Sequence, residues 1–322
     1  MWVMRCVAFW LGVGCLLLPW QSLASDQFDA GHAPFAITVA GKQIAYRDFV
    51  RLVMPGDTVT VKVPAAEDAR QRFTLLLDGQ SQPARSPGVW RWRAPEAGSV
   101  QQVRVRRADG EVVQVHVLVM RPLGAVRGQY LNGYRIGSYP STPLNGNPIY
   151  LPPPGLIEVT ESMLDIRVSP HFTLGQFLCK QQPDAWPKYM ALREPLLVKL
   201  ELLLEEVNRR GIRTDSFVVM SGFRTPWYNS TIGNGAYSRH IWGGAADIYI
   251  DTNGSGRMDD LNGDGKLDMA DARVLHDIAE SLFAEPLFSR LSGGLGLYGP
   301  RSHRGAFLHV DARGHEARWA IP

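Results

Sequence analysis

The first third of the chain alternates between apolar and polar residues. Val59, Val61 and Val63 are separated by polar residues, and a second run has valine at 113, 115, 117 and 119. Successive side chains of a strand point to opposite faces of a sheet, so this pattern predicts strands with one buried face. The sequence RADGEV contains an Asp-Gly pair typical of a hairpin turn. These features predict an all-β, sandwich-like domain over residues 33–121.

The second half of the chain has the spacing of helices and buried strands. ALREPLLVKLELLLEEVNRRG places one apolar stripe on a helix, formed by Leu192, Leu196, Leu200, Leu203 and Val207, and Gly211 is placed to end it. SFVVMSG is typical of a short buried strand. We therefore expect an α+β domain over residues 169–322. Residues 122–168 are rich in Gly, Pro and Tyr without sustained periodicity, which predicts an ordered connector.

The N-terminal residues have the pattern of a secretory signal peptide. Arg5 precedes an apolar run from Cys6 to Pro19, and SLAS follows, which predicts cleavage after residue 24. No later stretch reaches the ~18 apolar residues of a membrane helix, so no membrane span is expected. Cys179 is the one cysteine after the signal, which excludes an intrachain disulfide. We expect a secreted, periplasmic protein.

Composition narrows the class of protein further. The chain has 322 residues, of which 45% are hydrophobic and 20% charged, as in globular proteins. This length favours two domains. The formal net charge of +3 is too small to indicate a nucleic-acid partner.

Candidate chemistry is concentrated near the C-terminus. In YSRHIWGGAADIYID, small residues separate His240 from Asp247, and GAFLHVDARG places His309 in a strand-like apolar run. Antiparallel pairing of the two runs would bring His309 beside Asp247. Catalytic zinc ions use three such ligands and keep a fourth position for water. A lone histidine is more often a surface or core residue, so spacing alone does not decide between these roles.

The order of four motifs carries more information than any one of them. SGFRTPWYN, SRHIWGGAADI, GGLGLYG and FLHVDARGHEARW follow one another. This series resembles the zinc D-Ala-D-Ala carboxypeptidase and murein endopeptidase superfamily, whose metal-binding fold is shared by the hedgehog signalling domain. It is most similar to the branch with a final His-Val-Asp motif, and the resemblance covers about residues 169–319.

The resemblance implies specific roles for residues of this chain. It implies an antiparallel sheet with flanking helices, and zinc ligands at His240, Asp247 and His309. Arg224 matches an arginine that faces the substrate, where its planar fork suits a carboxylate or an oxyanion; a structural ion pair is the alternative. Ser238 matches a serine that precedes the first histidine and is expected to bind substrate or to form a plain turn.

The general base departs from the family pattern. Many members have an acidic residue three positions before the last histidine, where this chain has Ala306. Asp311 is the first substitute and His303 the second. Alternate residues of a strand share a face, so Asp311 is expected either to act in catalysis or to hydrogen-bond a zinc ligand.

An acidic insert at residues 251–271 has a second metal signature. Its spacing matches an EF-hand calcium loop, with Gly265 at position 6, Leu267 at position 8 and these candidate ligands: Asp260, Asn262, Asp264, Lys266, Asp268 and Asp271. Asp271 replaces the usual glutamate. An earlier set that begins at Asp251 is incomplete. We expect a structural calcium ion at the Asp260 loop, with a solvated acidic turn as the alternative.

Together these patterns predict a zinc peptidase that acts on peptidoglycan, either as a carboxypeptidase or as an endopeptidase. Two alternatives stay open. One is a zinc-containing cell-wall binding protein without catalysis, which Ala306 allows. The other is a calcium-dependent adhesion or scaffold protein. The sequence gives no indication of a binding partner for the N-terminal domain.

Overall fold

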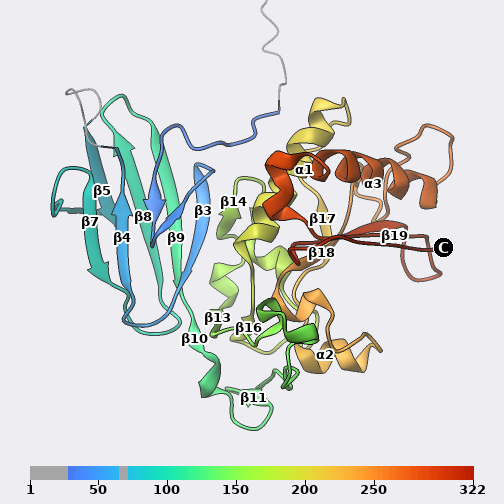
Figure 1. Ribbon diagram of the computed structural model, residues 1–322, viewed down its shortest axis with the longest axis horizontal. Coiled ribbons are helices and arrows are strands. Elements are labelled where there is room, and N and C mark those ends of the chain that lie inside the picture. Colours follow the sequence, from blue (N-terminus) through green and yellow to red (C-terminus); the bar gives the residue numbers. More distant parts are fainter. Residues whose placement is uncertain (1–27, 65–71) are drawn as a thin grey trace, which may run out of the picture.

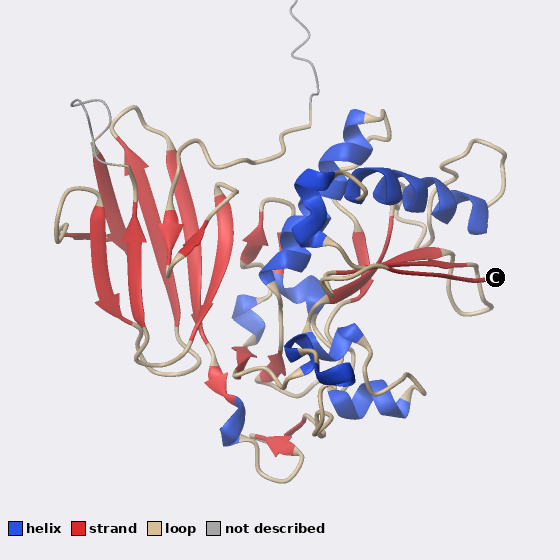
Figure 2. Ribbon diagram, in the orientation of Figure 1, coloured by secondary structure: helices blue, strands red, loops and turns tan. Residues whose placement is uncertain are grey.

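The computed structural model describes residues 28–64 and 72–322, so the predicted signal peptide lies outside the described residues. Figure 1 shows an all-β part formed by the first third of the chain, which lies beside a mixed part formed by the rest. The helices belong to the mixed part (Figure 2). The prediction of an all-β N-terminal region is confirmed.

Two sheets form the N-terminal sandwich. One has the order β2-β1-β4-β7, with β1 (Thr38–Val39), β2 (Lys42–Gln43), β4 (Thr58–Lys62) and β7 (Val89–Arg93). The other has the order β3-β9-β8-β5-β6, with β3 (Asp48–Val53), β5 (Phe73–Leu77), β6 (Gln80–Gln82), β8 (Val100–Arg107) and β9 (Val112–Val119). All pairs are antiparallel except β3 with β9.

The alternating valines form the core of the sandwich. Val59 and Val61 are fully buried, as are Val113, Val115 and Val117. Thr60 and Lys62, between the valines of β4, are at least partly exposed. The period-two pattern therefore identifies the buried face correctly.

Short elements connect the two parts of the chain. They are β10 (Arg121–Pro122), β11 (Tyr130–Leu131), β12 (Tyr134–Arg135), β13 (Gly155–Val159), β14 (Arg167–Ser169), β15 (Phe172–Thr173), β16 (Lys188–Met190) and several 3₁₀ turns. β13 lies between β10 and β16 in a small sheet. The segment is therefore ordered, as expected, and part of it packs as sheet.

A second five-stranded sheet organises the C-terminal part. Its order is β17-β18-β20-β19-β21, with β17 (Val218–Ser221), β18 (Ala245–Tyr249), β19 (Gly294–Tyr298), β20 (Phe307–Asp311) and β21 (Ala317–Ile321). Neighbouring strands are antiparallel, except that β21 runs parallel to β19.

Two long helices pack against each other, and one of them covers this sheet. They are α1 (Glu194–Arg209) and α3 (Met269–Phe283), and α3 contacts both β19 and β20 (Figure 1). The predicted stripe of α1 is buried, but Leu192 precedes the helix, which has Pro195 in its first turn. Proline is tolerated there because the first amide groups of a helix have no partner within it. Gly211 follows the helix with a φ of 90°.

Charged groups connect the sandwich to α1. The guanidinium of Arg51, on β3, is 3% exposed and pairs with the carboxylate of Glu194 at the start of α1. The Nε of Arg51 also donates a hydrogen bond to the carbonyl of Val39 at 3.0 Å. Breaking a buried ion pair leaves a charge without a partner, which costs free energy. This contact therefore holds the sandwich against the helix.

Cys179 is a free, buried cysteine. Burial raises the pKa of its thiol. No helix in the described part of the chain is long and apolar enough to cross a bilayer.

Lys199 of α1 is a buried cation beneath the sheet. Its Nζ donates hydrogen bonds to the carbonyls of Leu291 and Asp311, both at 3.0 Å, and lies 4.4 Å from the centre of the Phe283 ring. Burial lowers the pKa of Lys199 from 10.5 to about 8. The amine therefore ties α1 to the end of β20, although its environment disfavours the charge.

This lysine predicts a specific pH dependence of stability. Between about pH 8 and 10.5 the unfolded chain binds more protons at Lys199 than the folded chain, so stability rises with pH in this window. Chemical denaturation of the wild type and Lys199→Met across this window should show a difference in free energy of unfolding that grows by about 3 kcal/mol in favour of the wild type. Parallel curves for the two proteins would contradict this expectation.

Candidate metal centre

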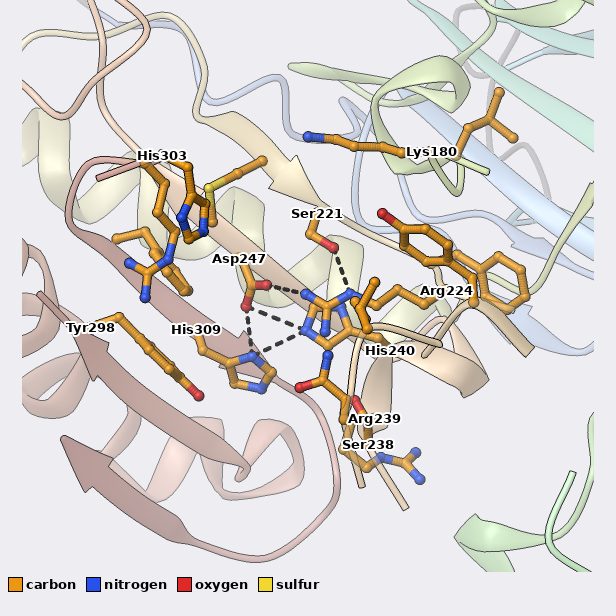
Figure 3. A pocket seen from close by; sticks show the side chains of 18 of the residues that line it. Lys180, Ser221, Arg224, Ser238, Arg239, His240, Asp247, Tyr298, His303 and His309 are labelled. Carbon is orange, nitrogen blue, oxygen red and sulfur yellow. Dashed lines mark hydrogen bonds and ion pairs between the residues drawn. The ribbon is translucent and has the colours of Figure 1, made fainter. Parts of the chain in front are cut away.

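Three side chains from separate segments converge on one face of the C-terminal sheet. His240 lies on a 3₁₀ turn (Arg239–Trp242), Asp247 on β18 and His309 on β20. Asp247 and His309 are direct partners across the antiparallel pair. The pairing expected from the sequence is therefore present, and Figure 3 shows the three side chains pointing toward one another.

The donor atoms form a small triangle. His240 Nε2 lies 3.2 Å from His309 Nδ1 and 3.3 Å from Asp247 Oδ1, and His309 Nδ1 lies 2.8 Å from the same oxygen. A tetrahedral ion with bonds of about 2.0–2.1 Å would separate its ligands by about 3.3 Å. All three residues are buried, at 2%, 4% and 6% exposure in chain order. Within the described residues, this group is able to hold a metal ion.

A tight glycine turn brings the first two of these residues together. Gly243 has a φ of 62°, a left-handed conformation that glycine adopts without strain. A Cβ at this position would lie 2.0 Å from the carbonyl oxygen of Ala191. The glycine therefore lets the chain turn from His240 directly into β18 while it passes against a neighbouring backbone.

Hydrogen bonds on the far side of each imidazole fix its orientation. His240 Nδ1 lies 2.6 Å from the carbonyl of Gly222, which can only accept, so Nδ1 carries the proton and Nε2 is free as a ligand. His309 Nε2 lies 3.1 Å from Asp311 Oδ2. Metal-bound histidines in proteins commonly have such partners, so the residues present fit a metal ion.

Electrostatics favour an anionic carboxylate in this centre. Burial alone would raise the pKa of Asp247, but His240 and His309 together hold it well below its usual range. Burial lowers the pKa of His240. Burial acts on His309 in the same direction, but hydrogen bonds to Asp247 and Asp311 outweigh it and raise its pKa. A proton on His309 must leave before its Nδ1 binds an ion, so acid opposes metal binding.

Arg224 contacts the centre directly. Its Nη2 donates to Asp247 Oδ2 at 2.5 Å and its Nε donates to Ser221 Oγ at 2.8 Å (Figure 3). The ion pair named as the alternative for this arginine is thus present. Arg224 also lines the adjoining cavity, so pairing with Asp247 leaves it beside any ligand that enters.

Asp311 lies behind the centre and not in the cavity. It is fully buried, and its carboxylate accepts hydrogen bonds from Arg313 Nη2 at 2.5 Å and from the Gly294 amide at 2.9 Å, in addition to its contact with His309. These contacts match the orienting role. His303 has an exposed side chain and lines the cavity, which places it on the open side.

The cavity in front of the metal centre has a volume of about 700 Å³. Ser238, which immediately precedes the 3₁₀ turn of His240, lines it together with several aromatic and basic residues. The predicted site residues Arg224, Ser238 and His303 therefore lie around one space with the three candidate ligands.

Trp319 also lines this cavity, although no sequence motif predicts a role for it. Its indole lies 5.1 Å from the imidazole of His309 between ring centres and donates a hydrogen bond to Tyr298 Oη at 2.9 Å. A Cβ on Gly296, which pairs with His309, would lie 2.3 Å from this indole. The glycines of GGLGLYG were the available signal, because an alternating glycine on a strand marks a close approach by another group.

The acidic insert forms a wound loop before α3. Asp260 accepts hydrogen bonds from the amides of Gly263 and Gly265, both at 2.7 Å. Asp271 accepts from the amide of Leu261 at 2.8 Å, which closes the loop across ten residues.

Asp268 and Asp271 also cap the start of α3. Lys266 contributes its backbone to the turn, with its amide donating to Asp264 Oδ1 at 2.9 Å, and Asn262 accepts from the Asp264 amide at 2.9 Å.

Comparison with known proteins adds little to this geometry. No family model matches the chain, and no curated protein matches it. One similar solved structure is described as "Structures of Clostridium thermocellum CbhA fibronectin(III)-like modules". It has 15% sequence identity, covers 26% of this chain and 94% of that chain, and gives a TM-score of 0.18, so it supports no argument about fold or function.

The contact between Asp311 and His309 leads to a prediction about metal affinity. Asp311→Asn should weaken the binding of a metal ion, with zinc as the probe, by about 10–100-fold, because loss of an orienting carboxylate behind a histidine ligand has an effect of this size. Competition with a chromophoric chelator measures the affinity. His303→Gln serves as the control and should bind zinc as the wild type does. Unchanged affinity in Asp311→Asn would contradict the orienting role.

Proposed function

We propose that this chain is a zinc-dependent peptidase that hydrolyses peptide bonds in the stem peptides or cross-links of peptidoglycan, as a D-Ala-D-Ala carboxypeptidase or a murein endopeptidase. The observation that carries this proposal is the convergence of His240, Asp247 and His309 at the wall of an open cavity. The four sequence motifs support the substrate class. The signal sequence supports secretion to the periplasm, where peptidoglycan lies.

Zinc fits the donor set because two imidazoles and one carboxylate are a known catalytic zinc set with room for water. When bound, the ion would activate water and polarise the scissile carbonyl. The protein's own contribution is geometric. Gly222 and Asp311 hold the imidazoles, and Arg224 holds the carboxylate while it faces the cavity, where its guanidinium suits an oxyanion.

Proton transfer is assigned to His303 in this proposal. Ala306 has no acid–base group, and Asp311 is enclosed behind His309. The side chain of His303 borders the cavity, so it is the candidate that can exchange protons with a bound peptide. The absence of a carboxylate at Ala306 is also the observation that favours a second candidate function, a zinc-containing cell-wall binding protein without hydrolysis.

Digestion of purified murein sacculi tests the proposed activity. Zinc-loaded wild type should release peptide fragments that mass spectrometry identifies, and a chelator should abolish the release. His309→Ala should lower activity by at least about 10³-fold, since it removes a ligand of the catalytic ion. His315→Ala, an exposed histidine six residues later, is the matched control and should be fully active. Zinc-loaded protein that binds sacculi and releases nothing would favour the binding protein.

We further propose that the Asp260 loop binds a structural calcium ion. The EF-hand spacing and the closure of the loop by Asp271 support this proposal. The ion would order the insert that leads from β18, which carries Asp247, into α3. A calcium-dependent adhesion protein would use the same loop to hold a partner.

A thermal shift experiment tests the calcium site. Calcium should raise the melting temperature of the wild type, because a ligand that binds only the folded state stabilises it. Asp260→Ala should lose most of this shift, whereas Asp277→Ala, on the exposed side of α3, should keep it. An equal shift in both variants would exclude calcium binding at the Asp260 loop.

A further inference from the structure

The cavity in front of the metal centre has an unbalanced charge. Five basic side chains line it: Lys180, Arg224, Arg239, Arg304 and Arg313. Asp247 is the one acidic residue among the described residues of its wall. Such an imbalance in a cavity attracts anionic ligands.

Three of the five cations are already engaged by the protein. Arg224 pairs with Asp247 and Arg313 with Asp311, each at 2.5 Å. Arg239 is buried and lies over the ring of Tyr150 at 4.7 Å. Lys180, the fourth, lies apart from the three candidate ligands in Figure 3. Arg313 and Arg239 are therefore occupied by contacts within the protein, and Arg224 is already assigned to the oxyanion of the proposed reaction. A second anionic group of a ligand would need another cation.

Arg304 is the fifth cation. The protein fixes the position of its guanidinium without pairing it with a carboxylate of the described residues. Its Nη1 donates hydrogen bonds to the carbonyls of Gly299 at 2.7 Å and Gly305 at 3.3 Å. Its guanidinium carbon lies 4.6 Å from the centre of the Phe307 ring. No carboxylate in the described ranges lies within ion-pair distance of Arg304.

The ring beneath Arg304 is itself fixed. Phe307 stacks on Tyr298 with ring centres 4.5 Å apart and planes inclined by 8°. Backbone bonds at one end and a flat aromatic surface below restrict the guanidinium to one orientation. An arginine held in this way loses little conformational entropy when it binds a planar carboxylate.

Arg304 is also close to the metal centre. Phe307 and His309 are alternate residues of β20, so their side chains share a face and are separated by roughly 7 Å along the strand. The negative charge of Asp247 favours the protonated form of Arg304, although burial lowers the pKa of this arginine overall. A ligand that reaches Arg304 therefore lies within about one peptide residue of the three candidate ligands.

We propose that Arg304 forms a carboxylate-binding subsite, which selects peptides that carry a free carboxylate about one residue from the metal centre. Recognition is by hydrogen bonds from the guanidinium to the carboxylate oxygens. Two carboxylates of a stem peptide have this chemistry, the C-terminal group and a side-chain group. Selection in cleavage rests on the proposed peptidase function, whereas selection in binding does not.

The test compares synthetic stem peptides that differ in one group. One peptide has all carboxylates free, a second has a C-terminal amide, and a third has the side-chain carboxylate amidated. Zinc-loaded wild type, Arg304→Met, Arg304→Lys and Arg301→Met are assayed for kcat and KM, and binding is measured by calorimetry for any peptide that is not cleaved. Arg301→Met is the matched control, because Arg301 is an exposed arginine in the same turn.

For the wild type we expect at least a tenfold preference for the free carboxylate, expressed in KM or in the dissociation constant. Arg304→Met should lose this preference with kcat nearly unchanged, Arg304→Lys should keep part of it, and Arg301→Met should keep all of it. The peptide whose amidation weakens binding to the wild type shows which of the two carboxylates Arg304 binds. Equal zinc content and equal melting temperature show that each variant is folded. If Arg304→Met does not fold, Arg304→Lys is used for the test instead.

The outcomes separate this inference from the proposed function. Cleavage without a carboxylate preference, or a preference that survives in Arg304→Met, overturns the subsite and leaves the peptidase standing. Binding that depends on Arg304 but leads to no cleavage supports the subsite and overturns the carboxypeptidase activity, while digestion of cross-linked sacculi decides the endopeptidase activity. If the peptides are neither bound nor cleaved, the subsite and the carboxypeptidase activity are both overturned.

Discussion

The metal centre depends on the register between β18 and β20. In the observed register Asp247 lies directly opposite His309, while Ile248 and Leu308, on the other face, are fully buried. A slip of one residue in either strand would turn its candidate ligand into the core and its aliphatic side chain toward the cavity. Burial of the apolar face therefore enforces the geometry of the polar one. The packing of α3 on β19 and β20 secures this choice.

A second constraint is the neutralisation of charge around the candidate ligands. Asp247 is balanced by Arg224 and the imidazoles, and Asp311 by Arg313. Removing one partner would leave a buried charge unpaired, which is far more costly than the pair is stabilising. The centre is consequently rigid before any ion arrives. Rigid ligands with fixed orientation favour one coordination geometry over others.

Much of this arrangement is predictable from local sequence, because the period of apolar residues is a local property. The valines around Val61 and Val115 identify the sandwich core, and the apolar neighbours of His309 identify its strand. The direction in which Asp311 faces is not local, because the amide of Gly294 on the neighbouring strand β19 donates to its carboxylate. The burial of Lys199 and the tilted ring contact of Trp319 with His309 likewise arise from tertiary packing. The start of α1 was predicted too early, because the apolar stripe includes Leu192 whereas the helical backbone begins at Glu194.

The ion pair between Arg51 and Glu194 has a mechanical consequence. Glu194 begins α1, and Lys199 of the same helix is bonded to the carbonyl of Asp311, two residues from His309. The sandwich is thereby coupled through one helix to the strand that carries a candidate ligand. A displacement of the sandwich relative to α1 would therefore act on the strand of His309 through these polar contacts.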